Sequence, residues 1–325
     1  MKKVRFGIVG PGNIAKKFAN AIKNVSEAEL VAVASRTMKK GEAFAHEFGI
    51  PTVFTSYDEM AASPDIDAVY VATPHPFHKP CAEIFLNAKK HVLCEKPVCV
   101  NAREARELYE CAKKNGVFLM EAMWTRFLPA IIEAQRVVSD GEIGEIRAIS
   151  ADFCYNMETM REHNVFNKDM AGGSLLDVGV YTINIAGFFE GYDVKTVNSH
   201  CRVENGVDTH TAAILSYENG VTAVITSALT TEKPSSAYIY GSEGYMFIPE
   251  CYRAQKLIIN KNGTEKVIER PSICDGFEEE IIEVCKCINK GKTQSDVHTM
   301  DDSIKVLEIM DTIRSQNGIV YPSDK

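Results

Sequence analysis

The first 120 residues alternate short apolar runs with helix-like segments, and this alternation constrains the fold more than any other feature. Short apolar runs end near residues 9, 34, 72, 94 and 120, and amphipathic stretches long enough for helices separate most of them. Strands and helices in this rhythm form right-handed βαβ units. The runs are apolar on both faces, as in a parallel sheet covered on both sides. We therefore predict an α/β fold with a doubly wound parallel sheet.

After about residue 121 the pattern changes to one of hairpins. A long strand is expected over 146–155, and Asn219-Gly220 and Asn262-Gly263 each separate two apolar runs. Asn-Gly between such runs is a strong two-residue hairpin signal. Amphipathic helices are expected near 277–289 and 299–315. We predict two domains, 1–121 and 122–325, the second an α/β domain with a largely antiparallel open sheet, whose C-terminal helix can pack back on the first.

Composition excludes several classes of partner. The 325 residues carry a net charge of −8 without a local basic patch, which argues against nucleic acid and anionic membranes. No apolar run is long enough to span a bilayer or to form a signal segment. The ten cysteines include no Cys-x-x-Cys pair and resemble neither a disulfide framework nor a zinc site. We expect a cytoplasmic protein with free thiols and no metal.

The first apolar run leads into Gly7-Ile8-Val9-Gly10-Pro11-Gly12-Asn13-Ile14-Ala15. Gly10-x-Gly12-x-x-Ala15 matches the dinucleotide fingerprint with alanine at its third position. Gly10 allows the tight turn, Gly12 lets a pyrophosphate approach the backbone, and the helix N-terminus faces the phosphates. A lone glycine pattern describes any tight turn, but the strand–turn–helix context here predicts a Rossmann dinucleotide-binding domain.

The residue that ends the second strand selects the cofactor in such domains. An acidic side chain there would bind the ribose hydroxyls of NAD. This chain has Ser35-Arg36-Thr37 instead. An arginine with neighbouring hydroxyls suits a 2′-phosphate, so NADP is favoured and NAD stays possible. The alternative is that Arg36 is a solvated loop residue.

Lys96 ends another apolar run and is followed by a proline, in the tetrapeptide Cys94-Glu95-Lys96-Pro97. Ligands of open α/β sheets bind beyond the carboxyl ends of the strands, so a lysine at a strand end points toward chemistry. Pro97 biases Lys96 toward extended geometry and helps to fix the strand exit. Taken alone, Glu95-Lys96-Pro97 fits an ordinary surface lysine in a strand-to-helix turn better.

A second unusual segment is Ala171–Tyr181, AGGSLLDVGVY. Ser174 is a plausible N-cap, and Asp177 and Tyr181 at i, i+4 project from one helix face. In most proteins this spacing means a capping aspartate and a core tyrosine. A free tyrosine titrates near pH ~10, so its deprotonation at neutral pH costs about 4 kcal/mol, which a nearby ammonium lowers. Lys96 with Tyr181 supplies this arrangement if the second domain folds over the sheet's carboxyl edge.

With Gly10-x-Gly12, Glu95-Lys96-Pro97 and Asp177-x-x-x-Tyr181 in this order, the chain resembles the Gfo/Idh/MocA oxidoreductase family over essentially its full length. Glu121–Pro129 (EAMWTRFLP) and Gly172–Asp177 (GGSLLD) resemble the branch that contains dihydrodiol and NADP-dependent D-xylose dehydrogenases. The resemblance implies an N-terminal Rossmann domain and a second domain whose open sheet forms an oligomer interface, as in a homodimer. It also implies NAD(P)-dependent oxidation or reduction of sugars, polyols or diols.

The same resemblance implies roles for individual residues. Lys96 would be the catalytic lysine, Tyr181 the acid/base, and Asp177 would orient the substrate or the base. The other residues implicated are Asn13, Ile14, Thr73, Pro74, His75, His78 and Glu95 toward the cofactor, to which Lys96 is also close, and Trp124, Arg126 and Phe153 toward the substrate. Tyr181 replaces the histidine of many members, and His75 replaces a common asparagine. For His78 a place at a helix start, and for Trp124 a core position, are the alternatives.

We therefore predict an oxidoreductase that moves a hydride between NADP(H) and a neutral sugar, polyol or trans-diol. Tyr181 would take the hydroxyl proton, and Lys96 would lower the pKa of the tyrosine. One rival is a non-catalytic NADP-binding sensor, which would bind cofactor without turnover. Another is a glycosidase that oxidises its substrate transiently with tightly held NAD; Arg36 argues mildly against it. The sequence does not name the substrate.

Overall fold

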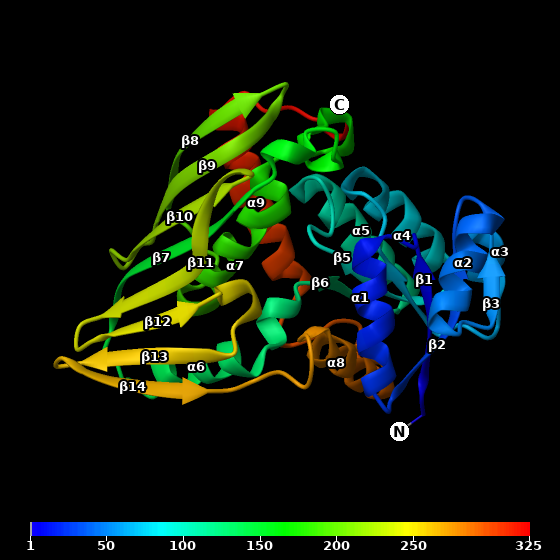
Figure 1. Ribbon diagram of the computed structural model, residues 1–325, viewed down its shortest axis with the longest axis horizontal. Coiled ribbons are helices and arrows are strands. Elements are labelled where there is room, and N and C mark those ends of the chain that lie inside the picture. The colour runs from blue at the N-terminus through cyan, green and yellow to red at the C-terminus, as the bar shows by residue number, and fades with distance from the viewer. Residues whose placement is uncertain (1) are drawn as a thin grey trace. The chain divides into compact units, whose positions relative to one another are not determined.

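The computed structural model describes residues 2–325, which separate into two units (Figure 1). The first contains residues up to 99, 103–124 and 273–303, and the second contains 100–102, 125–272 and 304–325. The chain therefore passes from the first unit to the second close to the predicted boundary at 121/122. Residues 273–303 return to the first unit. None of the helices within residues 2–325 combines the length and the apolar character needed to cross a membrane.

The first unit is built on a six-stranded parallel sheet in the order β3-β2-β1-β4-β5-β6. Its strands are β1 Val4–Val9, β2 Ala28–Ala34, β3 Thr52–Phe54, β4 Ala68–Val71, β5 His91–Glu95 and β6 Leu119–Ala122. Its helices are α1 Asn13–Ala21, α2 Met38–Phe48, α3 Tyr57–Ala62, α4 His78–Asn87, α5 Ala102–Asn115 and α8 Phe277–Asn289, and α9 Met300–Gln316 begins there. The order confirms the predicted doubly wound α/β fold.

The helix predicted over 277–289 packs against α1 and β2 of the first unit. Lys17 of α1 lies over the ring of Phe277 in α8, and the N–H of Leu119 in β6 donates to the carbonyl of Thr293 at 3.0 Å. Phe18 of α1 stacks on Tyr70 of β4 with ring centroids 4.0 Å apart. The first unit is thus completed by a segment from late in the chain.

The second unit contains an eight-stranded sheet in the order β14-β13-β12-β11-β7-β10-β9-β8, in which only β10 and β7 pair in parallel. Its elements are α6 Pro129–Ser139, β7 Ile146–Asn156, α7 Val180–Glu190, β8 Thr196–Glu204, β9 Val207–Ser216, β10 Thr222–Ala228, β11 Thr230–Gly241, β12 Tyr245–Pro249, β13 Lys256–Lys261 and β14 Thr264–Glu269. The largely antiparallel sheet is as predicted, and both Asn-Gly segments lie in hairpins. The first is not the predicted two-residue turn, because the Tyr217 N–H donates to the Val221 carbonyl at 3.0 Å and leaves the three-residue loop 218–220, in which only Gly220 has positive φ. At the second hairpin Asn262 and Gly263 both have positive φ, 54° and 76°, as a type I′ turn requires.

The segment predicted as one α-helix from Ser174 onward begins differently. Leu175–Gly179 is a π-helical turn, and the α-helix α7 starts only at Val180. Ser174 makes no capping bond to the helix, because its hydroxyl donates to Asp208 at 2.5 Å. The predicted N-cap role of Ser174 is therefore wrong. π-turns within helices occur often at functional sites, and this one carries Asp177.

Asp208 fixes the start of the π-turn. One oxygen of its fully buried carboxyl accepts three hydrogen bonds, from the Ser174 hydroxyl, the Leu175 N–H at 2.7 Å and the Thr211 hydroxyl at 2.7 Å. The neighbouring Gly173 has φ 120°, and a Cβ there would lie 2.2 Å from the other carboxyl oxygen, so only glycine fits. Burial raises the pKa of Asp208 to about 6, although these hydrogen bonds oppose the rise.

This raised pKa makes stability depend on pH. The contribution of Asp208 is complete below its unfolded pKa of 3.8 and is lost as the pH rises through about 6. We expect wild type to lose on the order of 3 kcal/mol of unfolding free energy between pH 4 and 7 relative to Asp208→Asn, which stays neutral. Urea unfolding of both proteins across this range measures the difference.

Asp67→Asn is the matched control, because the hydrogen bonds from Arg5 outweigh burial and lower the pKa of Asp67 to about 2. Its contribution is lost only as the pH falls toward 2, so its difference from wild type should stay flat between pH 4 and 7. A constant difference between wild type and Asp208→Asn over the same range would contradict the assignment.

Candidate active site

The turn after β1 has the shape that a dinucleotide pyrophosphate requires. Gly10 has φ 91°, and a Cβ there would lie 3.0 Å from the carbonyl oxygen of Ala72. A Cβ on Gly12 would meet nothing within 4 Å, so the backbone at the start of α1 faces open space. The α1 N-terminus has no side-chain cap, and Asn13 and Ile14 of its first turn are exposed and half-buried. Loop and helix end therefore fit a nucleotide phosphate.

At the end of β2 the structure places a buried serine and an exposed arginine. Ser35 is 3% exposed, and its N–H donates to the carbonyl of Phe54 at 3.0 Å. Arg36 and Thr37 that follow are exposed. The side chain of Arg36 is close enough to Tyr57 to oppose the burial that raises the pKa of that tyrosine. A positively charged guanidinium therefore lies where the adenosine half of the dinucleotide is predicted to bind.

The loop after β4 is tied to the loop after β5 by a histidine. The buried ring of His78 lies between two carbonyl oxygens, with Nε2 2.6 Å from Thr73 O and Nδ1 2.8 Å from Pro97 O. Burial lowers the pKa of His78 to about 4. Pro74 is exposed and His75 is half-buried in the same loop. His78 starts α4, and direct contact between its ring and the cofactor stays a prediction.

Lys96 leaves the end of β5 from a turn held by its neighbours. The carboxyl of Glu95, 6% exposed, accepts the Tyr70 hydroxyl and the Lys96 N–H, the latter at 3.1 Å. The Lys96–Pro97 peptide bond is cis. Burial raises the pKa of Glu95, and the nearby Lys96 and the two hydrogen bonds offset only part of the rise. Lys96 itself is half-buried at the carboxyl edge of the sheet, where the sequence predicted it.

Trp124 and Arg126, predicted toward the substrate, are both buried at 7% exposure. In the first unit, Trp124 stacks on Phe277 with ring centroids 4.6 Å apart and 12° between the planes. In the second unit, Arg126 donates to the hydroxyl of Tyr192, and its guanidinium lies 4.2 Å from the ring centre of Phe188. Each therefore has a packing role within its own unit, and substrate contact stays a prediction.

Tyr181 belongs to a group of four aromatic rings in the second unit. The ring of Phe153 on β7 lies 5.4 Å from Tyr181, 6.1 Å from Tyr155 and 4.3 Å from Tyr252, on which it stacks. The hydroxyl of Thr125 donates to the carbonyl of Tyr252 at 2.7 Å and fixes the loop. Tyr181, on the first turn of α7, is 7% exposed. The resemblance implied a substrate-contacting role for Phe153 and an acid/base role for Tyr181, and the structure places the two rings side by side.

Asp177 is bound by a residue that sequence reasoning missed. The hydroxyl of Tyr155 donates to Oδ2 of Asp177. Burial, together with the adjacent Asp177 carboxylate, raises the pKa of Tyr155 far above that of a free tyrosine. Tyr155 therefore stays protonated and acts as a permanent donor, which orients the carboxylate. The only sequence signal for Tyr155 was its place two residues after Phe153, on the same face of the strand.

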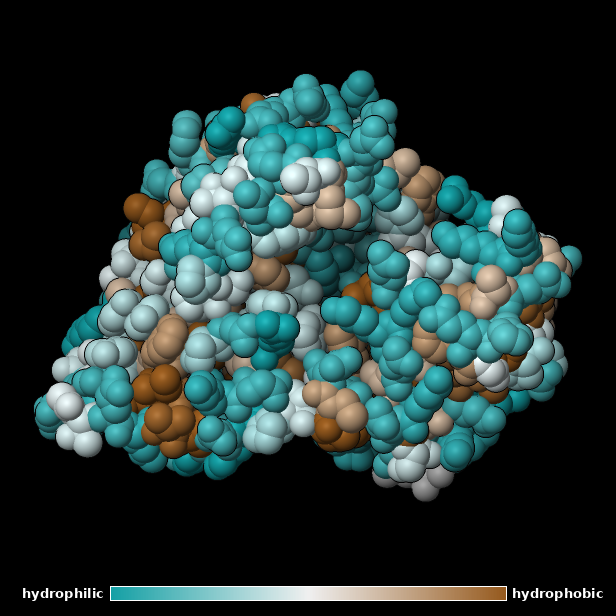
Figure 2. Space-filling model, in the orientation of Figure 1, coloured by the Kyte–Doolittle hydropathy of each residue, from teal (hydrophilic) through white to brown (hydrophobic). Residues whose placement is uncertain are grey.

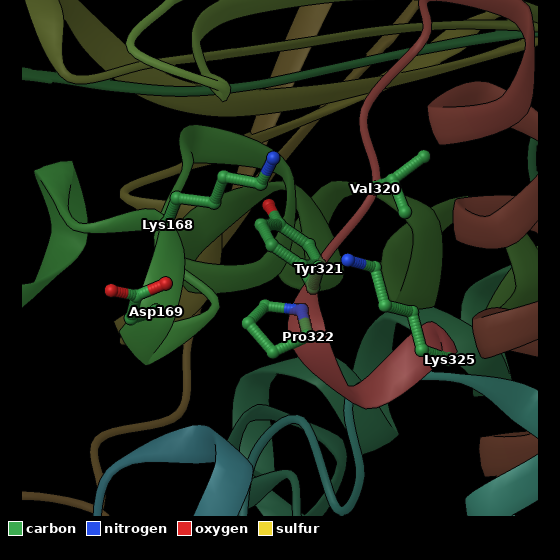
Figure 3. Close-up of a pocket in the computed structure, with 6 residues that line it drawn as sticks. All are labelled: Lys168, Asp169, Val320, Tyr321, Pro322 and Lys325. Carbon is green, nitrogen blue, oxygen red and sulfur yellow. The ribbon is translucent and has the colours of Figure 1, made fainter.

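A pocket of about 350 Å³ adjoins this aromatic group. It is lined by Phe153, Cys154, Tyr155, Glu232–Ser236, Phe247, Pro249, Glu250 and Tyr252. A second hollow, of about 260 Å³, lies near the C-terminus and contains none of the predicted site residues (Figure 3). Its wall includes Tyr321, whose hydroxyl donates to the carbonyl of Gly172 just before the π-turn. The first pocket is the better candidate for a substrate.

The structure thus forms two groups, one in each unit. The first holds the Gly10–Gly12 turn, Arg36 and Lys96 on a sheet edge; the second holds Asp177, Tyr181 and Phe153 beside a pocket. Over residues 2–325 no set of three His, Cys, Asp or Glu side chains is placed to hold a metal ion. The chemistry available is nucleotide binding together with a lysine, a tyrosine and a carboxylate for proton transfer.

Curated relatives match almost the whole chain. Trans-1,2-dihydrobenzene-1,2-diol dehydrogenase of Mus musculus is 34% identical over 334 aligned residues, covering 99% of each chain. The protein of that name from Homo sapiens is 32% identical, again with 99% of each chain covered.

Solved structures agree in fold. A 3-ketoreductase from Actinomadura kijaniata in complex with NADP and TDP-benzene superposes with a TM-score of 0.89 at 27% identity, over 97% of this chain and 98% of that one. An aldose-aldose oxidoreductase from Caulobacter crescentus complexed with glycerol gives 0.89 at 26%, over 97% of each. A levoglucosan dehydrogenase at 19% identity and a TM-score of 0.90 shows the fold alone.

Two family models match successive parts of the chain. Residues 4–123 match the oxidoreductase family with an NAD-binding Rossmann fold, and residues 131–247 match the GFO/IDH/MocA C-terminal domain. Together with the full-length relatives, these matches confirm the resemblance seen in the motifs. The chain therefore belongs to the GFO/IDH/MocA family and is an NAD(P)-dependent oxidoreductase.

Proposed function

We propose that the protein transfers a hydride between NADP(H) and a CH–OH carbon of a neutral sugar, polyol or trans-diol. The observation that carries this proposal is the setting of Tyr181, whose ring lies against Phe153 at the edge of the 350 Å³ pocket and one helical turn beyond Asp177. Names of the relatives support the substrate class, since they include a diol dehydrogenase and an aldose oxidoreductase.

In the oxidative direction the residues divide the work as follows. Tyr181 accepts the proton of the substrate hydroxyl as its carbon gives up hydride, and the ammonium of Lys96 favours the ionised phenol. Asp177, oriented by the Tyr155 hydroxyl, accepts a hydrogen bond from the substrate or from the base. Bound NADP supplies the hydride acceptor. Lys96 and Tyr181 come from different units, so the proposal requires both units to contribute to one reaction site.

The pocket wall favours a neutral ring. Phe153 and Tyr252 present a stacked pair of aromatic faces, which suit the C–H face of a sugar or an unsaturated ring. The cation on this wall, Lys233, is paired with Asp152 at 2.5 Å. With that charge balanced, hydroxyl groups rather than phosphates or carboxylates are the expected polar groups of the substrate.

Lys96→Met and Tyr181→Phe test the proton relay. Removing the ammonium or the phenol should lower kcat by roughly 10²- to 10⁴-fold, because each takes part in proton transfer. Affinity for NADPH, measured by fluorescence titration, should stay close to wild type in Tyr181→Phe. The assay is the absorbance of NADPH with pentoses, hexoses and trans-diols, run in parallel with NAD.

Either variant with wild-type turnover would contradict these assignments. Tight NADPH binding without turnover on the whole panel would support the sensor function instead. A cofactor that copurifies and shows no net absorbance change while a glycoside is cleaved would support the glycosidase.

We further propose that the phosphate of NADP lies against Arg36. Support comes from the exposed guanidinium after β2, flanked by Ser35 and Thr37, at the position where an acid would favour NAD. The A. kijaniata structure contains NADP in the same fold.

Arg36→Ala should weaken NADPH binding about 10- to 100-fold, the value of one or two charge-assisted hydrogen bonds, and leave NADH binding unchanged. Titration of both cofactors measures the ratio of the two dissociation constants. Arg36→Lys keeps the charge but loses the paired geometry, so an intermediate ratio is expected. An unchanged ratio in Arg36→Ala would place the phosphate elsewhere.

We also propose a homodimer through the second sheet. Directly paired residues lie on one face, and the register joins Val267, Ile258, Phe247, Tyr238, Ser150, Val224 and Ile214 across seven strands. Val267, Val224 and Ile214 are 45–54% exposed. Figure 2 shows hydrophobic side chains at the surface over β13 and β14. An apolar row of this length favours a second copy as its cover.

Val224→Lys places a charge within this row and should convert the dimer to a monomer, as measured by analytical ultracentrifugation. Ile273→Lys is the control, because Ile273 is an equally exposed apolar residue (57%) outside the sheet. A wild-type chain that is monomeric at micromolar concentration, or a Val224→Lys dimer, would contradict this interface.

A cytoplasmic location completes the proposal. All ten cysteines are free thiols, and eight of them are buried, as expected for a protein of a reducing compartment.

A further inference from the structure

The first unit contains a buried cluster that the mechanism does not use. Glu121 at the end of β6, His298, and Ser303 in the first turns of α9 are each 1% exposed. One carboxyl oxygen of Glu121 lies 2.9 Å from His298 Nε2 and accepts the Ser303 hydroxyl at 2.7 Å. The other oxygen accepts the N–H of Val98 at 2.9 Å.

A serine, a histidine and a carboxylate together suggest a hydrolytic triad, but the geometry excludes one. In a triad the carboxylate and the serine bind opposite nitrogens of the imidazole. Here Glu121 and Ser303 both lie against Nε2, while Nδ1 is buried without a hydrogen-bond partner. The serine hydroxyl is also inaccessible and donates to the carboxylate. The cluster is therefore a hydrogen-bond anchor.

Glu121 acts as the acceptor of this anchor. Burial alone would raise its pKa, but the hydrogen bonds from His298 and Ser303, the charge of His298 and the Val98 N–H outweigh burial and lower it. Glu121 is thus a carboxylate at neutral pH, with three donors directed at it. Charge-assisted hydrogen bonds of this kind are shorter and stronger than neutral ones.

The anchored residue, Val98, ends the turn that carries Lys96. Three successive main-chain groups of this turn are each held by a buried side chain. The Lys96 N–H is bound by Glu95, the Pro97 carbonyl by His78, and the Val98 N–H by Glu121. Since the direction of a side chain follows from the backbone that bears it, these bonds set where Lys96 points.

We propose that Glu121, supported by His298 and Ser303, is a positioning residue that fixes the backbone of the Lys96 turn for proton transfer. This inference rests on the proposed role of Lys96. It also accounts for the return of residues 273–303 to the first unit, because two of the three donors to Glu121 come from positions 177 and 182 residues further along the chain.

The experiment compares Glu121→Ala with Glu121→Gln in the full-length protein. Alanine frees the Val98 N–H and should lower kcat about tenfold or more, because small displacements of a reacting group are costly to the rate. Glutamine keeps an acceptor for Val98 and should restore most of kcat. The dissociation constant of NADPH should stay within about twofold in both, since the phosphate loop is untouched, so kcat falls without loss of cofactor binding.

Glu283 provides the matched control. It is another buried carboxylate of the first unit, but its hydrogen bonds come from Ser295, at 2.7 Å, and from Lys286 and Cys287, which lie outside the Lys96 turn. Glu283→Gln should leave kcat unchanged.

If Glu121→Ala does not fold, Ser303→Ala serves instead, since it removes one hydrogen-bond donor to Glu121 and should lower kcat severalfold with the same NADPH affinity.

A second readout separates this inference from the proposed role of Lys96. Reductive ¹³C-methylation labels lysine amines, and the Lys96 signal is assigned by its absence in Lys96→Met. That signal should move in Glu121→Ala and stay in place in Glu121→Gln and Glu283→Gln. An unmoved signal and unchanged kcat in Glu121→Ala, with Lys96→Met inactive, would overturn the positioning role alone. An active Lys96→Met would overturn the role of the lysine, whatever the Glu121 variants show.

Discussion

Two buried carboxylates hold the places where side chains of the proposed reaction site leave the backbone. Glu121 takes three donors beneath the Lys96 turn, and Asp208 takes three at the start of the π-turn that carries Asp177. A carboxyl group in an apolar interior is unfavourable unless it is fully hydrogen-bonded. Glu121 meets this condition at both oxygens, whereas Asp208 meets it at one, since its Oδ1 is buried without a hydrogen-bond partner. Each carboxyl accepts one main-chain N–H, from Val98 or from Leu175, and so ties a turn of the chain to the core. Ionisation is less favourable at Asp208, where the effect of burial on the pKa outweighs that of the hydrogen bonds.

Much of the fold followed from local sequence. The alternation of strands and helices, the glycine turn after β1 and the positions of both Asn-Gly hairpins depend on residues close together in the chain, and each was predicted correctly. The π-turn at Leu175–Gly179 was not, because its cause is distant: Ser174, read as a cap, instead donates to Asp208 on another strand. A helix start looks the same in sequence whether its serine accepts from its own helix or donates elsewhere.

The candidate site shows the same difference between local motifs and long-range contacts. Lys96, Asp177 and Tyr181 were proposed from short motifs, and Phe153 from the resemblance. No such motif marked Tyr155, Tyr252 or the partners of Glu121, because the roles of these residues depend on contacts with residues distant in the sequence. Tyr155 meets Asp177 from a neighbouring strand, and His298 meets Glu121 from 177 residues away. No local pattern in a single sequence identifies such long-range pairs.

The central claim is that a lysine of the Rossmann unit and a tyrosine of the second unit share one reaction site. A crystal structure of the protein with NADP and an unreactive polyol bound tests it most directly. The account predicts Lys96 Nζ within hydrogen-bonding distance of Tyr181 Oη or of the same substrate hydroxyl, beside the nicotinamide ring. A polyol bound at the nicotinamide with Tyr181 remote from both its hydroxyls and Lys96 would contradict it.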